Sequence, residues 1–293
     1  LAVGYSRLLY NPNWQVGIQS GFSIESDYFS VPVGLSISHQ KFDASRKISV
    51  GIQTFFDDLR WGRVNPGYFR PIKLIYPVEL RYREWFDKYR RTSFNLTTAL
   101  YQVINRKAQL AMFAEVVYQR GLLSTPFHRV YFNDRAKTEK VEYLPDERWK
   151  IPLGAQFNWF MTNRLILRSY YRFYWDTFGI SSHTVQIETP LKLTSLVTLS
   201  PLARFYCQRA SPYFRAYGGH DLQADYYTSD YDLSALTSYK LGLSVRYAPQ
   251  TPLFRSYAFQ SLNLQYSFYK RSDGLSAHII SLVTDFVRKS AGK

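Results

Sequence analysis

The stretch YWDTFGISSHT, residues 174–184, contains the residue types of a hydrolytic triad. Ser181 and Ser182 offer nucleophiles, His183 offers a base, and Asp176 offers an orienting carboxylate. Adjacent residues of a β-strand point to opposite faces, so Ser182 and His183 would diverge, and only distant partners could complete a triad. We therefore expect a protein that is not an enzyme, in which His183 forms hydrogen bonds within a hairpin.

A second candidate is a charged inner surface built from alternating strands. In the stretch 164–174, leucine and aromatic residues fall on one face and arginines on the other. If Tyr174 pairs with Ser182 across a hairpin, the antiparallel register places Arg168 opposite Glu188. Such a wall could select anionic solutes, but we favour ion pairs that fill the interior. The charged residues expected to face inward are Arg164, Arg168, Arg172, Glu188, Arg204, Arg246 and Glu115.

No metal site is expected from the spacing of potential ligands. Cys207 is the only cysteine, which excludes an intramolecular disulfide and a zinc site made of cysteines. Carboxylates gather in one loop, but their spacing does not fit a 12-residue calcium loop. The residues concerned are His39, His128, His183, His220 and His278, spread along the chain, and the loop residues Asp221, Asp225, Asp230 and Asp232. We expect no cofactor.

The 37 basic residues outnumber the 22 acidic ones, and many stand beside tyrosine or phenylalanine. That mixture suits single-stranded nucleic acid, but here the aromatic residues follow a two-residue period, so no nucleic-acid partner is expected. The basic residues concentrated between 57 and 91 suit lipid phosphates, including those of lipopolysaccharide, or an acidic partner protein.

The elements that must position these residues are long alternating strands. Hydrophobic residues alternate with Gly, Ser, Gln, Asn, Lys or Arg in WQVGIQSGFSI (14–24), ISVGIQTFF (48–56), YKLGLSVRY (239–247) and SLNLQYSF (261–268). Lys240 and Arg246 fall on the polar phase of the third stretch. Many such stretches run about nine to eleven residues, the length of a tilted strand that crosses a bilayer. Aromatic residues lie near the strand ends, as in the girdles of transmembrane barrels: Trp14, Phe55, Phe56, Trp159, Phe160, Tyr174, Trp175, Phe268 and Tyr269.

Short and long connections alternate along the chain. Tight turns are expected at YNPN, FDASRK, INRK, MTNR and PLKLTS, and large extracellular loops near 57–89, 121–147 and 211–236. This alternation is typical of outer-membrane barrels. We predict one domain over 1–293, an all-β antiparallel transmembrane barrel with about 13 strands in this chain. Because even numbers prevail, about 14 strands are expected in the full protein, with 12 as the alternative.

The segment 174–184 also resembles the YWDxWGIxSHT hairpin of DUF3570, an uncharacterised family of predicted outer-membrane β-barrels. Its matching residues are Tyr174, Trp175, Asp176, Gly179, Ile180, Ser182, His183 and Thr184. GLLSTPFHRVY (121–131) and DYYTSDYDLS (225–234) are similar to two further segments of that family, and ESDYFSVPVGLSISHQKF (25–42) to its early hairpin. Two positions depart from the pattern: Thr125 replaces the usual Asp, and Asp232 the usual Arg.

The resemblance implies a barrel in the outer membrane of a Gram-negative bacterium, encoded in neighbourhoods that often include a small lipoprotein. It implies no established activity. We expect a structural or accessory subunit that docks other outer-membrane proteins or a lipoprotein. The alternative is a channel for small anionic solutes through an arginine-lined lumen.

Overall fold

Thirteen strands succeed one another in a single antiparallel pairing order in the described part of the computed structural model, which comprises residues 2–9, 13–24, 28–59, 90–125, 128–136, 138–249 and 257–288. They are β1 (Ala2–Leu8), β2 (Trp14–Gly21), β4 (Phe29–Gln40), β5 (Arg46–Asp58), β6 (Arg90–Asn105), β7 (Ala108–Gly121), β10 (Glu147–Phe160), β11 (Ile166–Asp176), β12 (Ser181–Glu188), β14 (Val197–Gln208), β15 (Leu236–Tyr247), β16 (Tyr257–Arg271) and β17 (Ser276–Arg288).

Two short strands extend this sheet, and two others form a separate hairpin. β3 (Ser23–Ile24) pairs with β4, and β13 (Leu191–Lys192) pairs with β14. β8 (Arg129–Tyr131) pairs with β9 (Glu139–Val141) apart from the main sheet. The helical element that the described residues include is the three-residue 3₁₀ turn η2 (Tyr231–Leu233), and no helix among them is long and apolar enough to cross a membrane.

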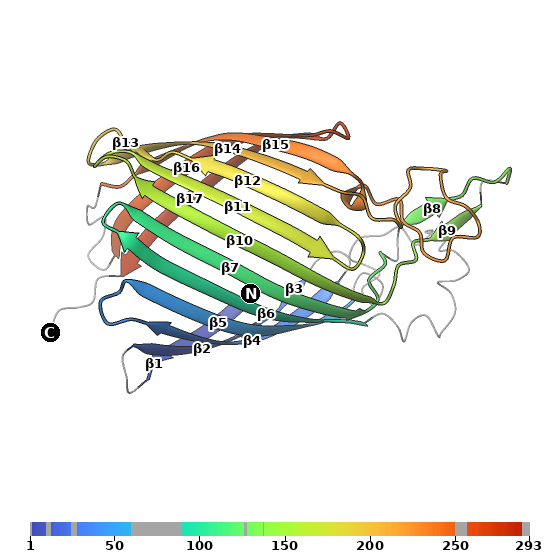
Figure 1. The fold of residues 1–293 in the computed structure, drawn as a ribbon, viewed down its shortest axis with the longest axis horizontal. Coiled ribbons are helices and arrows are strands. Elements are labelled where there is room, and N and C mark those ends of the chain that lie inside the picture. Colours follow the sequence, from blue (N-terminus) through green and yellow to red (C-terminus); the bar gives the residue numbers. More distant parts are fainter. Residues whose placement is uncertain are drawn as a thin grey trace.

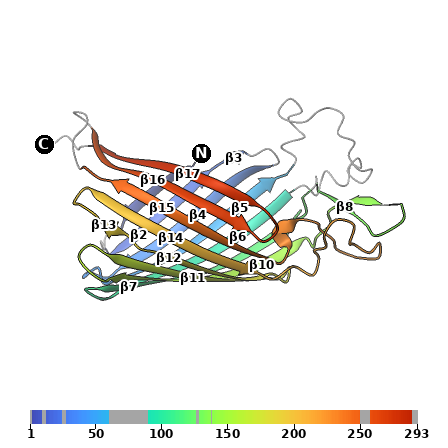
Figure 2. The same cartoon turned by 90° about the horizontal axis from the view of Figure 1, so that it is seen from above.

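The main sheet curls into a barrel-like cylinder, with β1 and β17 at the two ends of the pairing order (Figures 1 and 2). Tight connections between successive strands, such as 41–45, 106–107 and 161–165, gather at one end of the cylinder. The hairpin β8–β9 projects from the opposite end (Figure 1). The long connections that the structure describes leave this opposite end, but the turns between β11 and β12 and between β16 and β17 are tight there as well, so the predicted alternation of short and long connections is not strict.

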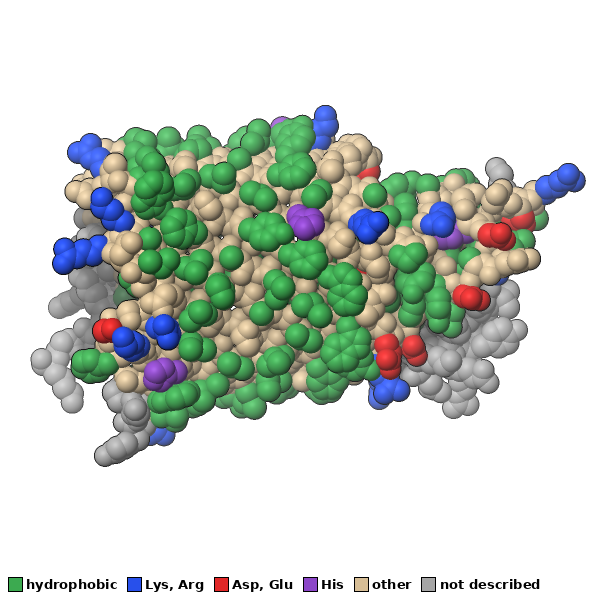
Figure 3. Space-filling model, viewed as in Figure 1, with side chains coloured by type: hydrophobic (Ala, Val, Ile, Leu, Met, Phe, Trp, Pro, Cys, Tyr) green, Lys and Arg blue, Asp and Glu red, His purple; other side chains and the backbone are tan. Residues whose placement is uncertain are grey.

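Register gives the wall two chemically different faces, because residues paired across antiparallel strands point to the same side. Ile18, Leu35, Ile52 and Leu96 form one continuous row across β2, β4, β5 and β6, and all four side chains are exposed. The adjacent row, Gly17, Ser36, Gly51 and Thr97, lies on the other face. On the face seen in Figure 3, hydrophobic side chains cover the cylinder between charged residues near its two ends, and the hydrophobic rows are exposed on other strands too, so the polar rows face inward.

The aromatic residues near the strand ends divide between the two faces. Trp14, Phe56, Trp159 and Trp175 lie in the outward rows and are exposed, as a membrane girdle requires. Their neighbours lie in the inward rows, because alternation turns every second residue around. The expectation of a girdle is therefore wrong for four inward-facing residues: Phe55, Phe160, Tyr174 and Tyr269.

Candidate functional site

The two long connections around β10–β12 fold against each other into one unit beyond the strand ends, which we call the cap. It comprises the described residues of 122–146, between β7 and β10, and of 209–235, between β14 and β15. Isolated bridges join the segments at Tyr143 and Tyr227 and at Phe132 and His220. Figures 1 and 2 both show this unit extending past the sheet. These loops are thus ordered by contacts with each other.

The tight turn between β11 and β12 forms the base of the cap's hydrophobic core. Phe178 and Ile180 are buried there with Leu144 and Leu233, one residue from each cap segment. Tyr213 packs edge-on against Phe178, with 5.7 Å between the ring centroids. The hairpin predicted from the YWDTFGISSHT stretch is therefore the element on which both loops rest.

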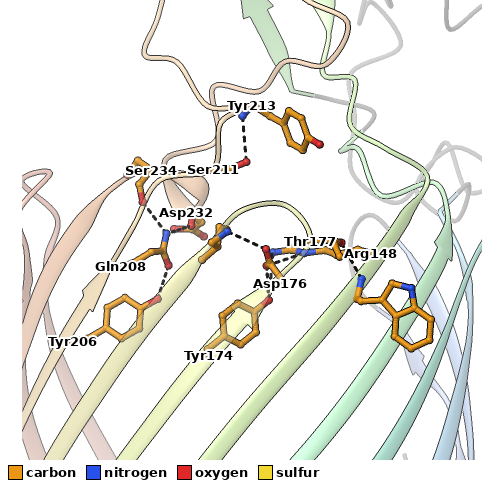
Figure 4. A network of polar contacts seen from close by, with 12 residues as sticks. Arg148, Tyr174, Asp176, Thr177, Tyr206, Gln208, Ser211, Tyr213, Asp232 and Ser234 are labelled. Carbon is orange, nitrogen blue, oxygen red and sulfur yellow. Dashed lines mark hydrogen bonds and ion pairs between the residues drawn. The ribbon is translucent and has the colours of Figure 1, made fainter.

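Asp176 is fully buried at the end of β11, with 0% of its surface exposed (Figure 4). Its carboxylate accepts hydrogen bonds from Nε of Arg148 at 3.0 Å, from the same guanidinium's Nη2, from the hydroxyl of Tyr174 at 2.7 Å, and from the backbone N–H of Ile180 at 3.1 Å. The Arg148 guanidinium also lies over the Phe178 ring, 4.4 Å from its centroid. A buried carboxylate is stable only when it is so paired and hydrogen-bonded, and here the pairing joins β10 to the hairpin.

A second buried carboxylate, Glu142, joins the two cap segments. It is 2% exposed, accepts a hydrogen bond from the backbone N–H of Thr125 at 2.5 Å, and accepts another from the Thr228 hydroxyl. Nδ1 of His128 lies 3.9 Å from the same carboxylate, and the nearby negative group raises the pKa of His128. Glu142 thus holds together residues of 121–131 and of 225–234.

The segments that resemble DUF3570 at 121–131, 174–184 and 225–234 therefore meet in the cap and its base. Gln208, the last residue of β14, adds a further tie, because its side-chain amide donates to the carbonyls of Asp232 at 2.8 Å and Ser234 at 2.7 Å (Figure 4). The departure at Asp232 has a structural partner, since its carboxylate lies 2.6 Å from Nη1 of Arg271. An arginine at position 232 would place two like charges there.

Two further titratable groups of the cap, His220 and Asp230, are also held by hydrogen bonds. Nε2 of His220 lies 2.9 Å from the carbonyl of Thr228, and burial lowers the pKa of this histidine. Asp230 accepts from the backbone N–H of Asp232 at the start of η2, and burial raises the pKa of Asp230. Within the described ranges, no three His, Cys, Asp or Glu side chains gather as a metal site would require.

The hydrolytic arrangement considered for the hairpin does not form. Ser182 is buried on the inward face opposite Gln208, whereas His183 lies on the outward face opposite Cys207. Nδ1 of His183 is 2.8 Å from the hydroxyl of Tyr171. His183 therefore bonds within the hairpin, as expected, but along its strands and not at its turn.

The same hairpin design occurs a second time in the chain, a relation that sequence reasoning missed. Residues 171–183 and 266–278 share the pattern Y-x-F-Y-x-x-x-x-G-[I/L]-S-x-H. In the second copy, which joins β16 to β17, Nδ1 of His278 lies 2.7 Å from the hydroxyl of Tyr266. Gly179 and Gly274 both have positive φ angles, +79° and +99°. A search for internal repeats at a spacing of 95 residues would have found the pair.

The strands of the inner wall pair in the predicted register, and one of the charged residues expected to face inward does not lie on a strand. Arg168 lies opposite Glu188, with 3.5 Å between Nη1 and Oε1, so the predicted cross-strand pair is confirmed. Arg172, Arg204, Arg246 and Glu115 also lie in inward rows. Arg164, by contrast, lies in the turn before β11, because that strand begins at Ile166.

Several recesses open along this inner wall. One, of about 360 Å³, is lined by residues that include Thr97, Phe113, Glu115, Tyr170 and Arg172. A second, of about 460 Å³, is lined by Arg204, Tyr206, Ser238, Lys240, Tyr269 and Ile279. A third, of about 690 Å³, is lined by residues that include Lys192, Thr198 and Arg246. Lys240 was absent from the predicted set of inner charges. The predicted basic loop residues between 60 and 89 lie outside the described residues, whereas Arg91 pairs with Asp57 at 2.7 Å.

Solved structures of outer-membrane proteins share this fold. The chain superimposes on a bacterial polysaccharide outer membrane secretin with a TM-score of 0.53 and 8% identity, covering 99% of this chain and 78% of the secretin. It matches CdiB from Acinetobacter baumannii (TM-score 0.47, 10% identity, 99% of this chain and 50% of CdiB). It also matches the siderophore receptor PirA from Pseudomonas aeruginosa (TM-score 0.47, 12% identity, 95% of this chain and 58% of PirA).

The sequence comparisons identify the family of the chain but assign it no function. No curated protein matches the chain significantly in sequence. The model of the family described as "Protein of unknown function (DUF3570)" matches residues 2–272, which include strands β1 to β16, the whole cap and the first copy of the repeated hairpin pattern. The chain is a barrel-like, all-β member of the DUF3570 family.

Proposed function

We propose that the protein is an outer-membrane β-barrel that acts as a docking subunit, using the cap to bind another outer-membrane protein or a lipoprotein. The observation that carries this proposal is the prefolded cap, in which two long loops share a hydrophobic core and are joined by the buried carboxylate of Glu142. Loops fixed before binding lose less conformational entropy when a partner arrives, which favours association.

The surface of the cap has the composition of a binding surface. Tyr217 is 66% exposed while one side of its ring packs on Tyr131, with 4.8 Å between centroids. Leu222, Tyr226 and Tyr231 are also exposed on the same segment. Tyrosine is enriched at protein interfaces because a rigid ring with a polar tip gives contact area at small entropic cost.

A channel for small anions is the second candidate, and the basic inner wall favours it. Arg172, Arg204, Lys240 and Arg246 face inward and form no ion pair with any residue that the structure describes. Unneutralised cations along a water-filled wall would attract anions. Both functions place the protein in the outer membrane of a Gram-negative bacterium.

Extraction in mild detergent followed by mass spectrometry tests the docking function. The native protein should co-purify with one defined membrane protein or lipoprotein at constant ratio. Replacement of Tyr217 and Leu222 by serine should remove that partner, because it deletes exposed apolar contacts without touching the buried core.

Phe42→Ser is the matched control, because Phe42 is 91% exposed in the tight turn at the opposite end of the cylinder. It should leave co-purification unchanged. Isolation of the barrel always alone, or equal loss of the partner in the control, would contradict docking through the cap. Anion-selective conductance of the isolated barrel in planar bilayers, lost on reversing the charges of Arg172 and Arg204, would support the channel instead.

A further inference from the structure

We propose that the recess around Arg204 and Lys240 is a binding site for a phosphate-bearing solute, either inorganic phosphate or a small phosphate monoester. The site goes beyond the docking and channel functions, because binding of a solute at the inner wall requires neither a partner protein nor passage through the cylinder.

Cross-strand register places two cations side by side in this recess. Arg204 of β14 lies directly opposite Lys240 of β15, and Lys240 lies opposite Tyr269 of β16. Residues paired in this way have Cβ atoms about 4.5–5.5 Å apart, and like charges at that separation destabilise a sheet. A bound dianion would remove this repulsion.

The carboxylates of the neighbouring inner wall are already engaged elsewhere. Glu188 pairs with Arg168 at 3.5 Å, Asp176 pairs with Arg148, and Asp285 accepts a hydrogen bond from Ser261 at 2.6 Å. No carboxylate lines the recess. Among the described residues, Arg204 and Lys240 therefore have no internal counter-ion, in contrast to Arg168 one row away.

The remaining lining residues fit an anion with several oxygens. Ser238 and Tyr269 line the same recess and carry hydroxyl groups, Tyr206 lines it while its own hydroxyl donates to Gln208, and Ile279 adds an apolar patch. A guanidinium presents a planar fork of donors and an ammonium a compact charge, two groups that proteins commonly use for phosphate. The volume of about 460 Å³ leaves space for an organic group beside a phosphate, which is why the proposal includes monoesters.

Binding can be measured on the purified full chain in detergent by isothermal titration with inorganic phosphate and with glycerol 1-phosphate at constant ionic strength. Arg204→Gln and Lys240→Gln should each weaken binding about tenfold, the usual effect of removing one charge-assisted hydrogen bond. Arg204→Lys, which keeps the charge, should retain more affinity than Arg204→Gln. The heat-modified gel mobility typical of barrels would show that each variant is folded.

Arg246→Gln is the matched control, because Arg246 is another inward cation of β15 and lies outside the recess, opposite Thr198 and Asn263. The affinity of the Arg246→Gln variant for phosphate should equal that of the native chain. If all three glutamine variants weakened phosphate binding equally, phosphate would be attracted by the whole basic wall and not by this site, and the proposal would be overturned. The proposal would also be overturned if the native chain bound phosphate no more tightly than chloride. Loss of the cap's partner protein would affect neither result.

Discussion

Asp176 has the residue type of the orienting carboxylate in a catalytic triad, but in the structure it links the hairpin to β10. Its carboxylate collects hydrogen bonds from Arg148, Tyr174 and Ile180 while fully buried. A carboxylate beside serine and histidine suggests catalysis when the sequence alone is considered. Only the positions of its partners show whether it can react with a solute, and here no face of the carboxylate remains open.

Asp176→Asn should loosen the cap from the barrel. The substitution leaves the Arg148 guanidinium, itself largely buried, without its counter-charge, and breaking a buried pair of this kind costs about 3–5 kcal/mol. Limited proteolysis within 122–146 and 209–235 should become faster, while the strands stay protected. Asp43→Asn, in an exposed turn at the opposite end, serves as the control; equal proteolysis of both variants would show that Asp176 does not anchor the cap.

At the scale of elements, the two copies of the hairpin pattern offer a natural comparison. Both turns are closed by the same backbone hydrogen bonds: Gly179 N–H to the Asp176 carbonyl at 3.2 Å, and Gly274 N–H to the Arg271 carbonyl at 3.3 Å. They differ in their surroundings. A Cβ atom on Gly179 would lie 2.6 Å from Cδ of Pro212 in the cap, whereas one on Gly274 would meet nothing within 4 Å.

Gly179→Ala should therefore destabilise the protein more than Gly274→Ala. Both alanines would have to adopt a positive φ, at about 1–2 kcal/mol each. Only the alanine at 179 would also collide with the cap, which adds about 1–3 kcal/mol. Chemical denaturation of the two variants in detergent should show this order, and equal midpoints would mean that Pro212 does not pack on the hairpin.

The register between strands joined by tight turns could be predicted from sequence, and the register between strands joined by long loops could not. The short turn at Gly179 fixed the register that places Arg168 opposite Glu188. The position of Lys240 opposite Arg204 depends on strands joined through 209–235, and no local rule gives the register across such a connection. The pair Glu142 and Thr228, separated by 86 residues, was beyond sequence reasoning for the same reason.

At the scale of the whole molecule, the amino-acid composition follows from a sheet whose side chains alternate between an outward and an inward face. Outward rows hold most of the aliphatic residues and part of the aromatic ones, and inward rows hold Gly, Ser, Gln, the basic residues and the remaining aromatic ones. This is the arrangement expected of strands with lipid on one side and water on the other. The cap adds a folded unit at one end, where three of the segments that resemble the family meet, 121–131, 174–184 and 225–234.

Cysteine labelling in intact Gram-negative cells would test this architecture most directly. In a Cys207→Ser background, single cysteines would replace Tyr217 in the cap, Phe42 in the opposite turn, Thr97 on the inward face and Leu96 on the outward face. A membrane-impermeant maleimide should label position 217 on intact cells and position 42 only after the outer membrane is permeabilised. In purified barrels, position 97 should react and position 96 should stay protected by the detergent. Labelling of position 42 with protection of position 217 on intact cells, or equal labelling of 97 and 96, would contradict the account.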